Sequence, residues 1–203
     1  MDVLKRIGFK TLNFKDFCSM LEDETESLGE GKHTVADLKL LSTRHRGFIF
    51  ELFCREYLLN VAKYDEAYLL NDLPDAVRTE LRLSKQDLGI DIIARCRGDW
   101  VAVQCKFRTC RRDNPVSWRD LSTFLSLCQR SGPYARHIVM TSAPSVRRVG
   151  GKQEKDLSIC RQTFEKMDRT QWLLLLGDSG DKLPGSVASS AEEMRQKRLL
   201  KFN

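Results

Sequence analysis

The chain has 203 residues and a net charge of +6, with 41% apolar and 31% charged residues. This length suffices for one ordinary hydrophobic core, and the content of large apolar residues excludes an intrinsically disordered protein. No apolar run approaches the roughly 20 residues of a membrane span. The N-terminal residues lack the apolar stretch of a secretory signal, so we expect an intracellular chain, cytoplasmic or nuclear.

Seven cysteines form no C-x-x-C pair and lie mostly within apolar runs. This pattern is typical of buried thiols in a reducing compartment. A zinc site built from Cys96, Cys105, Cys110 and a histidine is an alternative, although these residues do not form a complete zinc-finger pattern.

The order of the expected elements predicts one α/β domain. We expect a helical extension over residues 1–40, the domain over 41–177, and a linker with a basic helix over 178–203. Within the domain, apolar residues at helical spacing predict a core helix over 44–62. The elements expected after it are a strand over 79–84, a hairpin over 90–95 and 100–107, a helix over 117–129, a strand over 137–142, a helix over 156–167 and a strand over 172–176. A hairpin followed by crossovers implies a mixed sheet flanked by helices.

The hairpin places three polar side chains at the end remote from its turn. If it is symmetric about residues 96–99, paired positions sum to 195, and Asp91 lies opposite Gln104. Lys106 then lies on the same face as Gln104, since side chains two apart on a strand point the same way. The hairpin therefore gathers a carboxylate, an amide and an ammonium group.

Such a group suits a hard cation, because Mg²⁺ is held by one or two carboxylates and other oxygen ligands. Asp91 and Glu51 offer carboxylates, and the Gln104 side-chain oxygen or the Cys105 backbone carbonyl offers the rest. A lysine beside the ion can orient or deprotonate an attacking water. The structural alternatives are a buried ion pair between Asp91 and Lys106, and an i, i+4 pair between Glu51 and Arg55.

The segment D-x-G-I-D-I-I-A over 87–94, followed by G-D-W-V-A-V-Q-C-K over 98–106, resembles the PD-(D/E)XK nuclease superfamily. The resemblance is to its Mrr-like restriction endonuclease branch, and also to archaeal-type Holliday junction resolvases. It covers about residues 44–177 and implies a restriction-endonuclease-like core. In that pattern Asp91 matches the metal-binding aspartate, Gln104 the glutamine of the Q-x-K variant and Lys106 the catalytic lysine. Glu51 matches the glutamate of the preceding helix.

The resemblance implies a metal-dependent DNA endonuclease that uses Mg²⁺, with Mn²⁺ as a substitute, and leaves 5′-phosphate and 3′-hydroxyl ends. It also implies a homodimer and an associated or fused helicase as possible partners. Gln104 stands where a full acidic set has a glutamate, which removes one charge from the site. An inactive nuclease-fold module that only binds DNA is therefore the alternative.

Positive charge is concentrated after the Q-x-K strand. Residues 104–155 contain eleven basic and three acidic side chains, as expected for a surface that binds a polyanion. A solvated surface is the alternative. Trp118, at the start of an amphipathic helix, is expected in the core rather than stacked on a base. The candidate DNA contacts are Arg108, Arg111, Arg112, Arg119, Arg147, Arg148 and Lys152.

Overall fold

The computed structural model describes residues 2–23, 35–84, 89–110, 113–147 and 154–177. It contains a five-stranded mixed sheet whose spatial order follows the chain. β2 pairs antiparallel with both β1 and β3, and β4 and β5 each run parallel to the strand before them. The strands are β1 (Glu66–Leu69), β2 (Ile92–Cys96), β3 (Asp99–Lys106), β4 (Arg136–Thr141) and β5 (Asp156–Ile159). The predicted α/β fold with a mixed sheet is confirmed.

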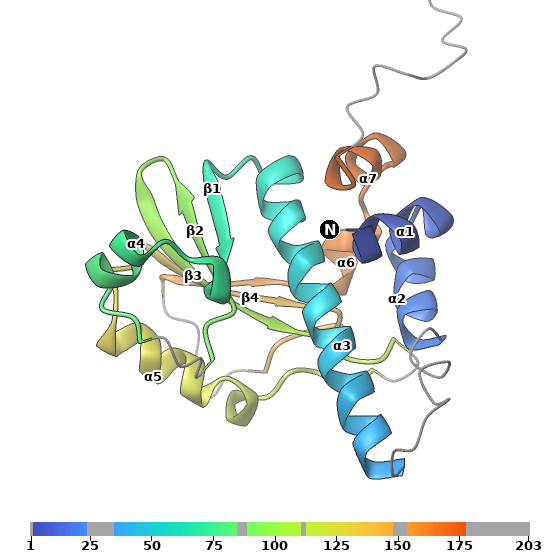
Figure 1. Ribbon diagram of the computed structural model, residues 1–203, viewed down its shortest axis with the longest axis horizontal. Helices are drawn as coiled ribbons and strands as arrows, with labels where there is room; N and C mark the ends of the chain where they lie inside the picture. Colours follow the sequence, from blue (N-terminus) through green and yellow to red (C-terminus); the bar gives the residue numbers. More distant parts are fainter. Residues whose placement is uncertain (1, 24–34, 85–88, 111–112, 148–153, 178–203) are drawn as a thin grey trace, which may run out of the picture.

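Helices cover both faces of this sheet (Figure 1). On one side lie α1 (Asp2–Thr11), α2 (Phe14–Asp23), α3 (Val35–Glu56), α6 (Arg161–Glu165) and α7 (Arg169–Leu175), and α3 ends in a π-helical turn, η2 (Tyr57–Val61). On the other side lie the short turn η3 (Leu70–Asp72), α4 (Asp75–Glu80), a second short turn η4 (Trp118–Asp120) and α5 (Ser122–Arg130). No described helix is both long and apolar enough to cross a bilayer.

The alternation of side chains along the strands divides the interior into two cores. In β3, Val101, Val103 and Cys105 face the core beneath α3, while Trp100 and Ala102 face the core beneath α5. This strand is buried on both faces, which explains its nearly continuous apolar sequence. Gln104 and Lys106 share the side of Ala102, so the polar positions follow the same alternation.

An aromatic cluster joins both ends of the described chain to α3. The ring centroid of Phe53 lies 5.2 Å from that of Phe14, 5.1 Å from that of Phe17 and 5.2 Å from that of Phe164. The indole Nε1 of Trp172 donates a 2.9 Å hydrogen bond to the carbonyl of Gly8 in α1. The helices α1 and α2 therefore pack into the same core as the sheet.

Three predicted elements are wrong. Residues 79–84 contain the end of α4 and a turn instead of a strand, and the edge strand β1 was not predicted. Residues 156–159 form β5, so only the second half of the expected helix is helical. The apolar run 172–176 lies in α7 and its C-cap, because Asp168 and Gln171 form a capping box that starts a helix, and the helix is buried against η2 and α2. The expected linker and basic helix over 178–203 lie outside the described residues.

Because Phe53 is fully buried among these rings, Phe53→Ala is expected to lower the free energy of unfolding by about 3–5 kcal/mol. Phe9→Ala is the matched control, since Phe9 is 45% exposed on α1, and its cost should stay within about 0.5 kcal/mol. Urea unfolding followed by circular dichroism measures both. Equal costs for the two variants would contradict the central position of Phe53.

Candidate active site

The hairpin has the predicted register. Ile92 pairs with Val103 and Cys96 with Asp99, and both pairs sum to 195. One position further, the amide of Asp91 donates a 2.9 Å hydrogen bond to the carbonyl of Val103. Asp91 therefore lies opposite Gln104 where β2 begins and β3 ends.

Asp91 and Gln104 are in direct contact. The Oδ2 atom of Asp91 accepts hydrogen bonds from Nε2 of Gln104 and, at 2.6 Å, from the backbone amide of Cys105. The same Nε2 atom lies 3.5 Å from the Cys105 carbonyl oxygen. Gln104 is only 3% exposed, so this contact fixes its amide group. In this arrangement the amide nitrogen faces two of the oxygens that were predicted to hold a metal ion.

The donor set fits a hard cation if the amide turns. A half-turn about the last side-chain bond of Gln104 exchanges its nitrogen and oxygen, which have nearly the same size. Asp91, Gln104 and Cys105 then present a carboxylate, an amide oxygen and a carbonyl oxygen from neighbouring positions. Oxygens of these types are the ligands of Mg²⁺.

Glu51 approaches this set from α3. Glu51, Asp91, Gln104, Cys105 and Lys106 all line one cleft of about 420 Å³. Glu51 and Asp91 also line a second hollow of about 460 Å³ on the side of η3. The two carboxylates therefore lie between two adjoining depressions, in a position open to a large substrate.

Arg55, which the sequence offers as a partner for Glu51, forms hydrogen bonds with another residue. The Nε and Nη2 atoms of Arg55 donate hydrogen bonds of 3.0 and 2.7 Å to Oε1 of Glu56. Arg55 thus pairs with its neighbour on α3.

Lys106 ends β3 on the same side as Gln104. Its carbonyl accepts a 2.6 Å hydrogen bond from the hydroxyl of Thr141, and that hydroxyl in turn accepts one from the amide of Ala143. Thr141 is fully buried and pairs with Lys106 across the parallel strands. In the part of the chain that the structure describes, no salt bridge joins the ammonium group of Lys106 to a carboxylate.

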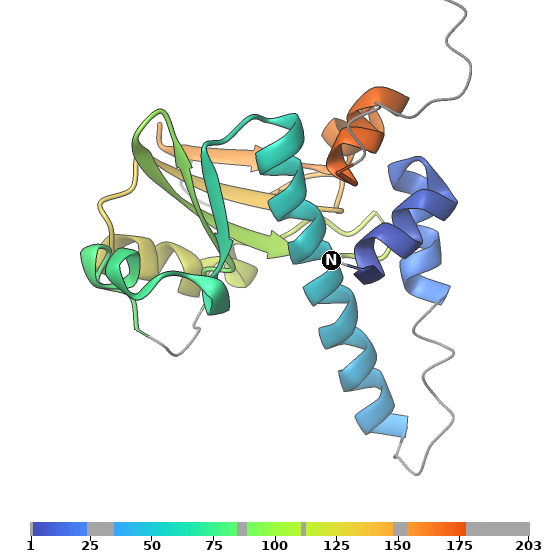
Figure 2. The ribbon, with the colours of Figure 1, turned by 45° about the horizontal axis from the view of Figure 1, so that its top comes forward.

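Residues of α3 that the sequence did not single out border the same cleft. Thr43 and Arg46 line it together with Glu51, and Phe48 lines the adjoining hollow with 48% of its surface exposed. Figure 2 shows that the N-terminal half of α3 extends beyond the strands. The only signal in the sequence is that these residues fall at the start of a predicted core helix.

The structure describes only some of the residues that were predicted to contact DNA. Arg108 borders the cleft and forms a 3.0 Å salt bridge with Asp120, while Arg119 and Arg147 are exposed on the surface. Trp118 is 41% exposed, so the prediction that it belongs to the core is wrong. Ser117 and Asp120 form a capping box at the start of its turn. Arg111, Arg112, Arg148 and Lys152 lie outside the described residues.

The cysteines do not form the alternative zinc site. Cys96 is at the hairpin turn and Cys105 at the far end of β3, about 20 Å away at 3.3 Å per residue. Within the described ranges, no group of three or more His, Cys, Asp or Glu side chains is arranged to hold a metal ion. Burial raises the pKa of the Cys54 and Cys105 thiols, so both stay protonated beneath the site.

Comparison with known proteins gives one match. A family model described as a restriction endonuclease matches residues 59–172, which include Asp91, Gln104 and Lys106. Glu51 lies before the matched segment. No curated protein and no solved structure matches the chain. The match confirms the resemblance to Mrr-like nucleases, and with it the restriction-endonuclease-like core.

The salt bridge at the cleft should depend on pH. Hydrogen bonds from Ser117 and the nearby Arg108 guanidinium hold the pKa of the Asp120 carboxyl below its ordinary value. A lowered pKa in the folded state means that Asp120 stabilises the fold above its unfolded pKa of about 3.9, and that this contribution is lost as the pH falls through the lower folded value. The midpoint of urea unfolding at pH 7 should therefore be higher for the wild type than for Asp120→Asn. This difference should shrink below about pH 4. A difference that does not vary with pH would contradict this assignment.

Proposed function

Because the chain belongs to the Mrr-type restriction endonuclease family, we propose that it is a metal-dependent endonuclease that hydrolyses phosphodiester bonds in DNA. DNA is the substrate that the family implies. The observation that carries the proposal is the contact of Asp91 with Gln104 and the Cys105 amide, in a cleft that Glu51 and Lys106 also line.

The proposed metal ligands are the carboxylates of Asp91 and Glu51, the side-chain oxygen of Gln104 and the carbonyl of Cys105. A bound Mg²⁺ or Mn²⁺ would supply Lewis-acid stabilisation of charge on the phosphate and lower the pKa of a bound water. Two features support this ligand set: the hairpin register brings Asp91 next to Cys105, and α3, which carries Glu51, packs on β3.

Lys106 is the residue proposed to orient or deprotonate the attacking water and to stabilise the developing negative charge. Lys106 lines the same cleft as Asp91 and Glu51. The buried hydroxyl of Thr141 holds the backbone of Lys106, which limits the movement of the strand end. A fixed cation in a partly buried site stabilises a transition state more than a mobile one, because little reorganisation is needed.

The proposed grip on DNA uses side chains around the cleft. Arg46 and Arg108 line it, and Arg119 lies one residue before the salt-bridge partner of Arg108. Contacts of arginines with phosphates fix the register of a protein on the duplex without reading its sequence. Their placement beside Lys106 would bring a backbone phosphate to the proposed metal ligands. Arg111, Arg112, Arg147, Arg148 and Lys152 stay candidates for the same role.

The first test is cleavage of supercoiled plasmid and linear duplex with Mg²⁺, Mn²⁺ or EDTA. Asp91→Asn should lower the cleavage rate at least about 1,000-fold, because it removes a charged ligand. Lys106→Met should lower it at least about 100-fold, as expected for the loss of a group that serves the water. Binding of duplex in EDTA should stay within a few-fold of wild type for both.

Matched controls accompany these variants. Asp75→Asn changes an exposed aspartate at the start of α4, and Lys166→Met changes an exposed lysine after α6. Neither should alter the cleavage rate more than twofold. Full cleavage by both Asp91→Asn and Lys106→Met would refute the proposed site.

Gln104→Glu tests the metal ligands directly. An added carboxylate should tighten Mn²⁺ binding by about tenfold in calorimetry, because affinity rises with ligand charge. Without metal the same variant should lose about 2 kcal/mol or more of stability, since a buried second charge would face Asp91. Unchanged Mn²⁺ affinity would show that the Gln104 side chain is not a ligand.

One observation favours a second candidate function, a nuclease-fold module that binds DNA without cleaving it. The Gln104 amide donates to Asp91 and approaches the Cys105 carbonyl, so a neutral group already satisfies these oxygens. Salt-dependent DNA binding by the wild type, with no cleavage of any substrate in Mg²⁺ or Mn²⁺, would select this function. Recovery of cleavage by Gln104→Glu would then identify the cause.

A further inference from the structure

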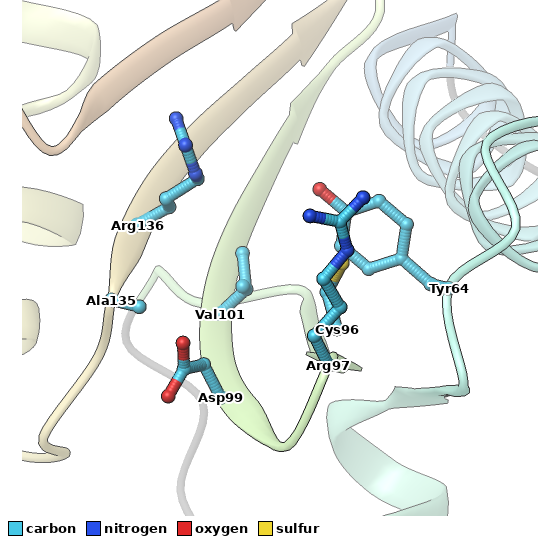
Figure 3. Close-up of a pocket in the computed structure, with 7 residues that line it drawn as sticks. All are labelled: Tyr64, Cys96, Arg97, Asp99, Val101, Ala135 and Arg136. Carbon is cyan, nitrogen blue, oxygen red and sulfur yellow. The ribbon is translucent and has the colours of Figure 1, made fainter.

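A separate hollow of about 390 Å³ lies at the turn end of the hairpin. Figure 3 shows it on the face of the sheet that α3 covers elsewhere. Val101 forms its floor, and it shares no lining residue with the cleft around Asp91. Its walls are Tyr64, Cys96, Arg97, Asp99, Ala135 and Arg136.

Three hydrogen-bond donors surround this hollow. Arg136 begins β4 and pairs with Val101, Arg97 comes from the hairpin turn, and Tyr64 follows η2. In Figure 3 the guanidinium of Arg97 is drawn in front of the Tyr64 ring, and the side chain of Arg136 rises on the other side of Val101. Among the described residues, no side-chain hydrogen bond or salt bridge engages either guanidinium or the Tyr64 hydroxyl. These donors are therefore available to a ligand.

The protonation of the donors is fixed. A guanidinium keeps its charge at any ordinary pH. Burial raises the pKa of the Tyr64 phenol, so the hydroxyl keeps its proton. The lining holds one carboxylate, Asp99, which is exposed, as are Arg97 and Arg136. The hollow therefore carries more positive than negative charge.

The backbone of Arg97 is held in an unusual conformation. Arg97 and Gly98 have φ angles of 54° and 88°, as a two-residue hairpin turn requires. Asparagine, aspartate or glycine normally occupies the first of these positions, because other side chains are strained there. Asp65 stabilises the turn by accepting a 2.7 Å hydrogen bond from the Arg97 amide. Strained residues of this kind gather at ligand sites.

We propose that this hollow binds the phosphate group of a small phosphorylated molecule. Two guanidinium groups offer paired donors that match phosphate oxygens, and the Tyr64 hydroxyl offers a further donor. The volume lies in the range of small-molecule sites, which leaves room for an attached group against Tyr64, Val101 and Ala135. A phosphate of a nucleic acid backbone has the same chemistry and is the other possible source.

The test measures binding in EDTA, where no cleavage occurs. Inorganic phosphate, deoxyadenosine monophosphate and a short DNA duplex are titrated by calorimetry into the full chain. The variants are Arg97→Asn and Arg136→Gln, with Arg169→Gln, at the exposed first residue of α7, as the matched control. Thermal melting checks that each variant folds. Arg97→Asn should melt at or above the wild-type temperature, because asparagine suits the turn.

If the hollow binds small molecules, phosphate or the monophosphate should bind with 1:1 stoichiometry. The affinity should be at least tenfold weaker in both pocket variants and unchanged in Arg169→Gln. Alternatively, neither small probe binds, but both pocket variants weaken duplex binding tenfold and reduce its salt dependence. In that case the hollow is a phosphate site whose ligand is the nucleic acid backbone. Binding that does not respond to either pocket variant, or no binding of any probe to the hollow, would overturn the proposal.

Discussion

The pairing register of β2 and β3 determines every other feature of the candidate site. Because side chains alternate along a strand, a slip of one residue would turn Gln104 and Lys106 into the core beneath α3, and Val103 and Cys105 toward the side of α5. The apolar residues that flank Gln104 exclude that slip, since the alternative buries an amide and an ammonium group among aromatic rings. The same apolar pattern therefore stabilises the fold and orients the polar groups.

The site also depends on elements that contact each other only in the folded chain. Glu51 reaches the cleft because Phe50 and Phe53, on either side of it in α3, are fully buried in the aromatic cluster. The strand end that carries Lys106 is held by Thr141 from β4, and Ser142 bonds the backbone of Arg108 in both directions at 2.7 Å. The two ends of the site thus rest on different core contacts, one on helix packing and the other on a buried hydroxyl network.

Local sequence patterns predicted the hairpin and its register, because alternation and turn position are properties of a short segment. They also indicated the cleft residues Asp91, Gln104 and Lys106, whose spacing the hairpin fixes. The exposure of Trp118 and the helix over 172–175 depend on capping boxes and on the neighbours of each segment, and apolar content alone does not report these. The orientation of the Gln104 amide depends on two contacts. One is with Asp91, thirteen residues earlier in the chain, and the other is with the adjacent residue Cys105.

The bond between Gly8 and Trp172 joins residues that are 164 positions apart in the chain. During synthesis at about 5–20 residues per second, α1 and α2 emerge roughly 8–30 s before their partner helix exists. Over that interval Leu4, Ile7, Phe14 and Phe17, which are buried in the finished protein, have no complete core to enter. The helices α1 and α2 therefore keep apolar side chains exposed on the ribosome until α7 has been synthesised, although they themselves are made long before it.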